Sequence, residues 1–423
     1  MLNFIKESCM RKLRILKKIG PGFVTGAADD DPSGLTTYAQ LGAQYGFQIL
    51  WASLWLIPLM ICVQEMAARI AIIRGEGLTK SLLKKFPRPV VFILVISLLI
   101  ANIINIGADI AGMAEAVALI SPIPCTVAAI VLTLGIVALE IFLPYKKYVF
   151  ILQFLCLSLL SYVVVGCIVK LEWGKILYHT IVPSINFFDK EFWYLMLATL
   201  GTTISPYLIF WQSSQEVEEK KARGLVLMGT TVEEVQNMRE DTRIGMFFSN
   251  LIMFFVIVVT ASFLFGKHTE IRSMADAASV LQPLAGSYAS WLFSLGVIGT
   301  GLLVIPVLAG SAAFALADFF DIPQGLDLMW WQARGFYTII FVSTLIGLIL
   351  NFIGVNVVDF LIFSSVINGV TLPLLLFALL MIANDEEIVG VHKNSLRMNL
   401  LGWITFGLFV GSIVIYLISA SFP

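Results

Sequence analysis

Long apolar stretches separated by short charged segments dominate this sequence and restrict it to one class of fold. Eleven stretches are long enough to cross a bilayer as a helix, which needs about 20 mostly apolar residues. They cover residues 20–42, 46–73, 89–118, 124–143, 148–169, 192–214, 244–266, 288–318, 334–353, 358–382 and 398–420. Because only helices and closed barrels satisfy their backbone in lipid, we expect an all-α integral membrane protein that forms one transmembrane domain over residues 1–423.

Composition excludes several other classes of protein. Charged residues make up 13% of the chain, whereas soluble domains contain about 25%. A net charge of −1 leaves no basic surface for nucleic acid. The five cysteines lack metal-ligand spacing and read as packing residues. The chain has no GxxxxGK[ST] phosphate loop and no long soluble segment, so we expect neither an enzyme nor an ATP-driven pump, and no cofactor.

The distribution of basic residues predicts how the chain crosses the membrane. With the N-terminus inside, 22 of the 27 Lys and Arg fall in inner segments. Such a bias indicates a multi-pass protein of the cell membrane with a cytoplasmic N-terminus and, for eleven spans, an external C-terminus. The start of the chain to Lys18 then reads as a cytoplasmic lead-in, and the loop from Glu216 to Arg243 as a solvated cytoplasmic connector.

Two of the predicted spans are interrupted by proline and glycine. The first contains Asp29, Asp30, Asp31, Pro32 and Gly34, and three adjacent carboxylates in a membrane segment indicate a functional cavity. The sixth contains the run Gly201-Thr-Thr-Ile-Ser-Pro-Tyr207. Paired interruptions that begin two halves of a chain point to a transporter site at the interface of inverted repeats. The plainer alternative is that each proline merely kinks a packed helix.

The prolines also identify candidate ligands for a cation. Each removes a backbone donor, which frees the carbonyl oxygen four residues earlier, at Ala28 and at Thr202. Together with the Asp31 carboxylate and the hydroxyls of Ser33, Thr203 and Ser205, these form an all-oxygen set. Oxygen ligands suit Mg²⁺, Ca²⁺ or Mn²⁺. Asp29 and Asp30 keep open roles: one binds the substrate with Asp31, and one carries a proton or pairs with a lysine near the cytoplasmic face.

At these positions the sequence resembles the Nramp family of divalent-metal transporters. The resemblance rests on Gly20-Pro-Gly-Phe23, Asp31-Pro32, the segments 41–51 and 63–69, and more loosely 365–373. It implies a LeuT-type fold of 11 transmembrane helices with broken helices 1 and 6. Two inverted five-helix repeats would cover residues 20–169 and 192–382, followed by an extra helix at 398–420.

The sequence departs from the family motifs at two ligand positions. The family's Asp-Pro-Gly-Asn is Asp31-Pro32-Ser33-Gly34 here, and its Met-Pro-His is Ser205-Pro206-Tyr207. The asparagine and the thioether are therefore absent, and the metal ligands we expect are Asp31, Thr202, Ser205 and Ala28. This set makes a magnesium-type substrate plausible, as in the Nramp-related magnesium transporters.

The resemblance further implies a proton pathway. An aspartate of the family's third helix pairs with an arginine of its ninth, and Asp109 and Arg334 look like these positions. Asp109 shares one helix face with Asn102, Asn105 and Gly112, and the last stands where the family has a glutamate. A buried ion pair that only fixes helix packing is the alternative.

Three functions remain open on the sequence. The leading hypothesis is a secondary transporter that moves a divalent cation, alone or with protons, by alternating access. The second is a sodium- or proton-coupled carrier of a small organic solute such as an amino acid, since half-helix ends also bind carboxylates and amines. The third is a channel or receptor-like membrane protein, which paired broken helices do not favour.

Overall fold

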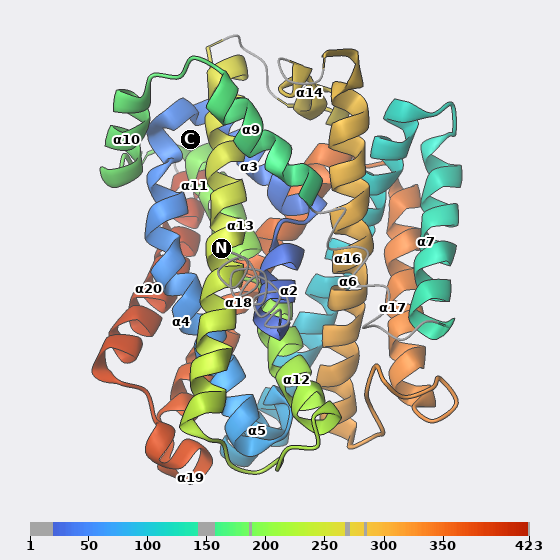
Figure 1. Ribbon diagram of the computed structural model, residues 1–423, viewed down its shortest axis with the longest axis vertical. Coiled ribbons are helices and arrows are strands. Elements are labelled where there is room, and N and C mark those ends of the chain that lie inside the picture. Colours follow the sequence, from blue (N-terminus) through green and yellow to red (C-terminus); the bar gives the residue numbers. More distant parts are fainter. Residues whose placement is uncertain (1–19, 143–156, 186–187, 267–270, 283–285, 422–423) are drawn as a thin grey trace, which may run out of the picture.

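The chain folds into a bundle of long helices (Figure 1). The computed structural model describes residues 20–142, 157–185, 188–266, 271–282 and 286–421, and these ranges contain no strand. Nine helical segments within them are long and apolar enough to cross a bilayer. The basic lead-in to Lys18 and the first part of the predicted span 148–169 lie outside the described residues.

Eight of the predicted spans correspond to one long helix each. These helices are α4 (Trp51–Arg74), α6 (Arg88–Ile120), α7 (Cys125–Phe142), α13 (Val232–Leu264), α16 (Ala289–Phe320), α17 (Arg334–Leu350), α18 (Val357–Ala383) and α20 (Leu396–Ser421). Helix α13 begins well before residue 244 because Thr231 and Glu234 form a capping box. The connector expected over 216–243 is therefore mostly helical.

Each of the two interrupted segments forms two consecutive helices with a short break between them. Helix α2 (Pro21–Asp29) ends before Asp30, and α3 (Pro32–Tyr45) follows. Helix α11 (Lys190–Thr203) ends before Ile204, and α12 (Pro206–Ala222) follows. A proline occupies the first position of both α3 and α12, where its missing N–H costs no hydrogen bond. The backbone leaves the helical conformation immediately before each proline.

Shorter helices complete the bundle, and α9 among them is the described end of the predicted span 148–169. The α-helical ones are α5 (Leu78–Lys85), α9 (Leu160–Ile168), α10 (Trp173–Ile181), α14 (Met274–Ser279) and α19 (Glu386–Val389). The 3₁₀ turns are η1 (Gly46–Ile49), η2 (Leu157–Leu159), η3 (Gly286–Tyr288), η4 (Asn351–Ile353) and η5 (Gly390–His392). We name the end formed by α5, α19 and the last turns of α12 the basic end, because the lysines of α5 and α12 gather there. It is the lower end in Figure 1.

The paired helices occupy the centre of the bundle (Figure 1). Both α2 and α3 pack on α13, α12 packs on α4 and α16, and α11 packs on α18. Glycines permit the closest approach: a Cβ at Gly26 would lie 2.2 Å from the carbonyl oxygen of Gly245, and one at Gly201 would lie 2.1 Å from that of Ser365. Small residues at such crossings are typical of helix packing in membranes.

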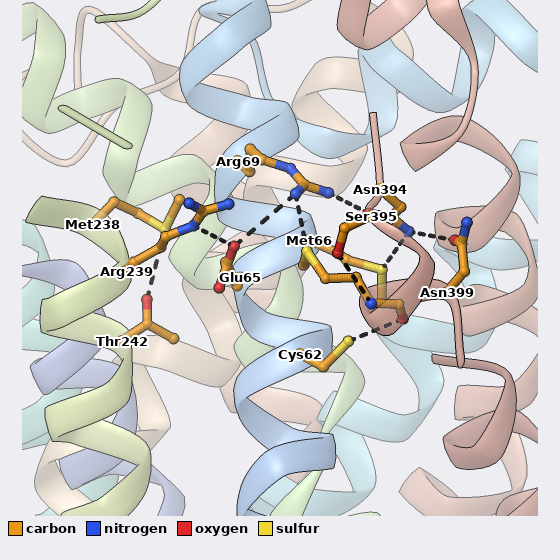
Figure 2. A network of polar contacts seen from close by, with 11 residues as sticks. Cys62, Glu65, Met66, Arg69, Met238, Arg239, Thr242, Asn394, Ser395 and Asn399 are labelled. Carbon is orange, nitrogen blue, oxygen red and sulfur yellow. Dashed lines mark hydrogen bonds and ion pairs between the residues drawn. The ribbon is translucent and has the colours of Figure 1, made fainter. Parts of the chain in front are cut away.

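A polar network ties α4 to its neighbours near the basic end (Figure 2). Arg69 donates to the side chain of Asn394, just before α20, and Arg239 of α13 donates to Glu65 at 2.5 Å. Arg69 also lies 4.0 Å from Glu65. Glu65 and Arg69 belong to the segment 63–69 that carries part of the resemblance. The network therefore gives this segment a structural role, because it joins α4, α13 and the start of α20.

Candidate functional site

Asp31 is the N-cap of α3 and faces the start of α12. Its Oδ1 accepts hydrogen bonds from the Gly34 amide at 2.5 Å and the Ser33 hydroxyl at 2.7 Å. The Tyr207 hydroxyl donates to Oδ2 at 3.2 Å. The residue is 1% exposed. Since a carboxylate oxygen accepts two hydrogen bonds, Oδ2 retains a lone pair for a further ligand.

Asp29 and Asp30 lie beside Asp31 and are equally buried. The Ser249 hydroxyl of α13 donates to Oδ2 of Asp29 and lies 3.5 Å from Oδ1 of Asp30. The other oxygen of each carboxylate has no hydrogen-bond partner. Within the described part of the chain, no Lys or Arg forms an ion pair with any of the three aspartates. Among the described residues, a serine and not a lysine contacts Asp29 and Asp30.

The second interruption supplies main-chain and hydroxyl oxygens. The Ser205 hydroxyl donates to the carbonyl oxygens of Gly201 at 2.8 Å and Thr202 at 2.7 Å. Part of the acceptor capacity freed by Pro206 is therefore used by Ser205 itself. The Thr202 carbonyl keeps a second lone pair, and the Ser205 oxygen keeps its own.

The two interruptions adjoin at Gly34 and Thr202. A Cβ at Gly34 would lie only 2.8 Å from the Thr202 hydroxyl oxygen, so the missing side chain lets α3 approach α11. The structure therefore brings Asp31, Thr202 and Ser205 into one region together with Tyr207. Ala28, fully buried in the last turn of α2, precedes Asp31 by three residues.

The chemistry of this region favours a cation bound by oxygen. In the described residues, no group of three or more His, Cys, Asp or Glu side chains is arranged to hold a metal ion. A cation between the interruptions would therefore have Asp31 as its charged ligand and carbonyl or hydroxyl oxygens as the others. Oxygen ligands of this kind are preferred by Mg²⁺, Ca²⁺ and Mn²⁺.

Asp109 belongs to the same region. It is fully buried in α6, and neither carboxylate oxygen has a hydrogen-bond partner. It lies within electrostatic reach of Asp31 and of the Ser33 amide. One turn later, a Cβ at Gly112 would lie 3.2 Å from Cβ of Pro32. The start of α3 thus faces a fourth carboxylate.

Arg334 does not pair with Asp109, so this part of the prediction is wrong. Arg334 is exposed and begins α17. Gly347, thirteen residues further along α17, is the residue that approaches Gly107 of α6. At about 1.5 Å per residue, Arg334 lies about 20 Å from that contact. The resemblance placed the arginine on the expected helix but not at the expected depth.

The other polar positions divide into packing residues and unpartnered ones. Asn102 donates to the Leu308 carbonyl and the Ser311 hydroxyl of α16, both at 2.8 Å, which joins two helices. The amide groups of Asn105 and Asn368 are buried without partners. Buried polar atoms in a membrane protein usually meet a ligand or water. Tyr207 and Ser249 were missed as contacts, because a lone hydroxyl in an apolar helix has no spacing signal.

Comparisons of this sequence with known proteins identify a family that it matches. Residues 22–419 match the family model described as "Natural resistance-associated macrophage protein-like". The chain is 25% identical over 409 residues to the divalent metal cation transporter MntH of Caldanaerobacter subterraneus subsp. tengcongensis, covering 96% of this chain and 94% of the relative.

Solved structures agree on the fold. A manganese transporter of Eremococcus coleocola aligns with a TM-score of 0.79 at 19% identity, covering 95% of this chain and 85% of the other. Mhp1, a nucleobase-cation-symport-1 family transporter with bound bromovinylhydantoin, aligns with a TM-score of 0.59 at 12% identity, covering 96% and 92%. At these identities the structures support the arrangement of helices and nothing finer.

Proposed function

Because the chain belongs to the Natural resistance-associated macrophage protein-like (Nramp) family, we propose that it is a secondary transporter that carries a divalent metal cation across the cell membrane by alternating access. One observation carries the proposal: Asp29, Asp30 and Asp31 are buried at an interruption between two helices, and no described basic side chain pairs with them. Each charge at such a depth costs about 2.5–3.5 kcal/mol on insertion scales. A bound dication offsets this cost.

The proposed ligands follow from the contacts around Asp31. Its carboxylate is the charged ligand, and the Ala28 and Thr202 carbonyls and the Ser205 hydroxyl complete the shell. Since Thr202 belongs to α11 and Asp31 precedes α3, the ion would join the two interrupted segments. Hard oxygen ligands and the lack of a thioether favour Mn²⁺ or Mg²⁺ over softer metals.

Proton coupling is the finer part of the proposal and rests on Asp109. Its carboxylate is close enough to Asp31 to repel it, so that a cation or a proton at one of them favours charge on the other. We assign Asp109 to the proton route. Arg334 contributes no ion pair to it.

We also propose eleven spans arranged as inverted repeats over 20–169 and 192–382, with α20 outside them, a cytoplasmic basic end and an external C-terminus. The packing supports this arrangement. The interrupted helix of the first half packs on α13, the second helix of the other half, and α12 packs on α4 in the same way. The third helices of both halves, α6 and α16, also pack on each other.

Uptake into proteoliposomes tests the proposal. The panel comprises Mn²⁺, Mg²⁺, Ca²⁺ and Fe²⁺, each with and without a pH gradient. We expect saturable uptake of Mn²⁺ or Mg²⁺ by the wild type and its loss in Asp31→Asn. Asp321→Asn is the matched control, because Asp321 is exposed at the basic end, far from the site. No uptake of any ion, with a thermal shift on adding an amino acid, would favour the organic-solute carrier instead.

A further inference from the structure

A second acidic chamber lies at the basic end, beneath α2. It is a cavity of about 290 Å³ between the start of α2, the last turns of α12 and the first turns of α13. These three helices converge in the lower half of Figure 1. Among the described residues, its lining includes five carboxylates and two basic side chains, Lys220 and Arg223. The described lining therefore carries a net negative charge.

Four of these carboxylates have partners. Asp241 accepts hydrogen bonds from the amides of Gly20, Gly22 and Phe23 at 2.7–3.3 Å, and so caps α2. Glu234 accepts from Thr231 in its capping box and lies 3.5 Å from Lys220. Glu219 pairs with Arg223, and Glu240 accepts from Gln236 at 3.3 Å.

Glu216 differs from them at one oxygen, although Gln212 of the same helix lies within hydrogen-bonding reach of its carboxylate. It is 7% exposed, lines the cavity, and its Oε1 has no hydrogen-bond partner. The charged groups that face it are Asp241, Glu219 and Arg223, and the arginine is already paired with Glu219. Lys220 is held by the carbonyls of Ile72 and Gly229 at 3.0 and 2.7 Å. No described basic group is therefore left to neutralise Glu216.

A polar face of α12 connects this chamber to the Asp31 region. Ser205, Gln212, Glu216 and Glu219 are spaced seven, four and three apart, which places them on one side of the helix. Gln212 donates to the Thr242 hydroxyl of α13 at 2.7 Å. Glu216 lies ten residues beyond Pro206, or about 15 Å along the axis. The chamber is thus the next acidic position on the way to the basic end.

We propose that Glu216 forms a second cation station, which binds a divalent cation in its hydrated form between the Asp31 region and the basic end. Direct coordination is not expected, because the described lining has no three acidic, histidine or cysteine side chains around one ion and, unlike the Asp31 region, no carbonyl freed by a proline. The cavity instead accommodates an ion that keeps its water shell, as Mg²⁺ does readily. The waters donate to Glu216 and to the free lone pairs of its acidic neighbours. This inference rests on the proposed function, of which it is the exit step.

The two stations differ in whether the bound ion must give up water, and an experiment can distinguish the two cases. An ion at Asp31 must exchange water for protein oxygens, whereas an ion at Glu216 need not. Hexaamminecobalt(III), which has the size of hydrated Mg²⁺ and does not exchange its ligands, should therefore compete only at Glu216. We suggest titrating the full-length protein in detergent with Mn²⁺ and counting bound ions from the loss of the free-Mn²⁺ electron paramagnetic resonance signal.

The wild type should bind two classes of Mn²⁺, one of which hexaamminecobalt(III) displaces. Glu216→Gln should lose the displaceable class and keep the other, and Asp31→Asn should do the reverse. Glu233→Gln, an exposed change at the start of α13 outside the chamber lining, should behave as wild type. If Glu216→Gln does not fold, Glu216→Asp should keep both classes, with the displaceable one weakened about tenfold or more.

Persistence of the displaceable class in a folded Glu216→Gln protein, or its absence from the wild type, would overturn this inference. Failure of the proposed function looks different. In that case the non-displaceable class would be missing from the wild type or unchanged in Asp31→Asn, whatever Glu216→Gln does.

Discussion

Around the start of α3, the side chains of Asp29, Asp30, Asp31 and Asp109 place four carboxylates in a region nearly closed to solvent. Hydroxyls and amides satisfy only part of their oxygens, and three of the four residues keep at least one oxygen without a partner. Like charges at such spacing repel strongly where water is scarce. The region is therefore suited to hold positive charge, as a metal ion or as protons.

The change Asp31→Asn should reduce Mn²⁺ affinity at this site by at least about tenfold, because ligand charge sets the affinity of an oxygen site for a hard cation. The measurement is isothermal calorimetry on purified protein. The variant keeps an oxygen that can accept from the Gly34 amide, so its thermal stability should stay close to wild type. Wild-type affinity in a folded Asp31→Asn protein would exclude Asp31 as the charged ligand.

The change Gly34→Ala should lower stability by about 1–3 kcal/mol, because the new Cβ would lie 2.8 Å from the Thr202 hydroxyl oxygen. Thermal unfolding in detergent measures the effect. Thr202→Ala removes that oxygen but leaves the Thr202 carbonyl, so the double variant should recover part of the loss. Additive destabilisation in the double-mutant cycle would show that the two side chains do not meet.

For single residues, the sequence predicts which side chains are functional better than it predicts which side chains they contact. The run Asp29 to Asp31 is conspicuous because carboxylates in apolar segments are costly, and the structure does bury all three. The sequence pattern instead predicts a solvated connector around Glu216 and Asp241, because the charges around them hide the helical pattern. The predicted pairing of Asp109 with Arg334 is wrong because the depth of a residue in the membrane depends on how far α17 is shifted along α6.

Among the elements, the two interruptions follow from local rules. A proline cannot donate to the residue four positions earlier, so helices that begin at Pro32 and Pro206 are favoured by the sequence itself. Which group then donates to the freed carbonyl depends on tertiary packing. Ser205 lies close enough to donate to Thr202, and no pattern in the sequence distinguishes that contact from a hydroxyl directed at a ligand.

Glycine contacts between helices give a prediction at the element scale. Gly245→Ala should lower the unfolding temperature and uptake together, since its Cβ would lie 2.2 Å from the Gly22 carbonyl oxygen and would push α2 from α13. Gly135→Ala in α7 is the matched control, because nothing lies within 4 Å of its Cβ. That change should be neutral or stabilising by up to about 1 kcal/mol. Equal effects of the two changes would argue against tight α2–α13 packing.

For the whole molecule, hydropathy predicts the nine apolar helical segments that the described residues contain, and the family resemblance predicts their LeuT-like arrangement. The excess of Lys and Arg on one side of the predicted topology matches the basic end, where α5 and α12 carry basic last turns. Hydropathy could not separate the charged first turns of α13 from a loop, because a capping box and not an apolar stripe begins that helix.

Orientation can be tested directly with single cysteines in a background that lacks the five native ones. A cysteine at Glu387 of α19 should react with a membrane-impermeant thiol reagent only from the cytoplasmic side. A cysteine at Lys175 of α10 should react only from outside. Both residues are exposed. A lack of reaction from one side would therefore mean that the membrane, and not burial in the protein, blocks the reagent. Reversed labelling would contradict the proposed topology.

The central claim is that one carboxylate and main-chain oxygens from two interrupted helices hold a divalent cation. Anomalous diffraction from crystals grown with Mn²⁺ tests it most directly. We expect a peak between the Asp31 carboxylate and the Thr202 carbonyl in the wild type, and none there in Asp31→Asn. A Mn²⁺ peak that lies away from both residues, or one that survives the substitution, would contradict the account.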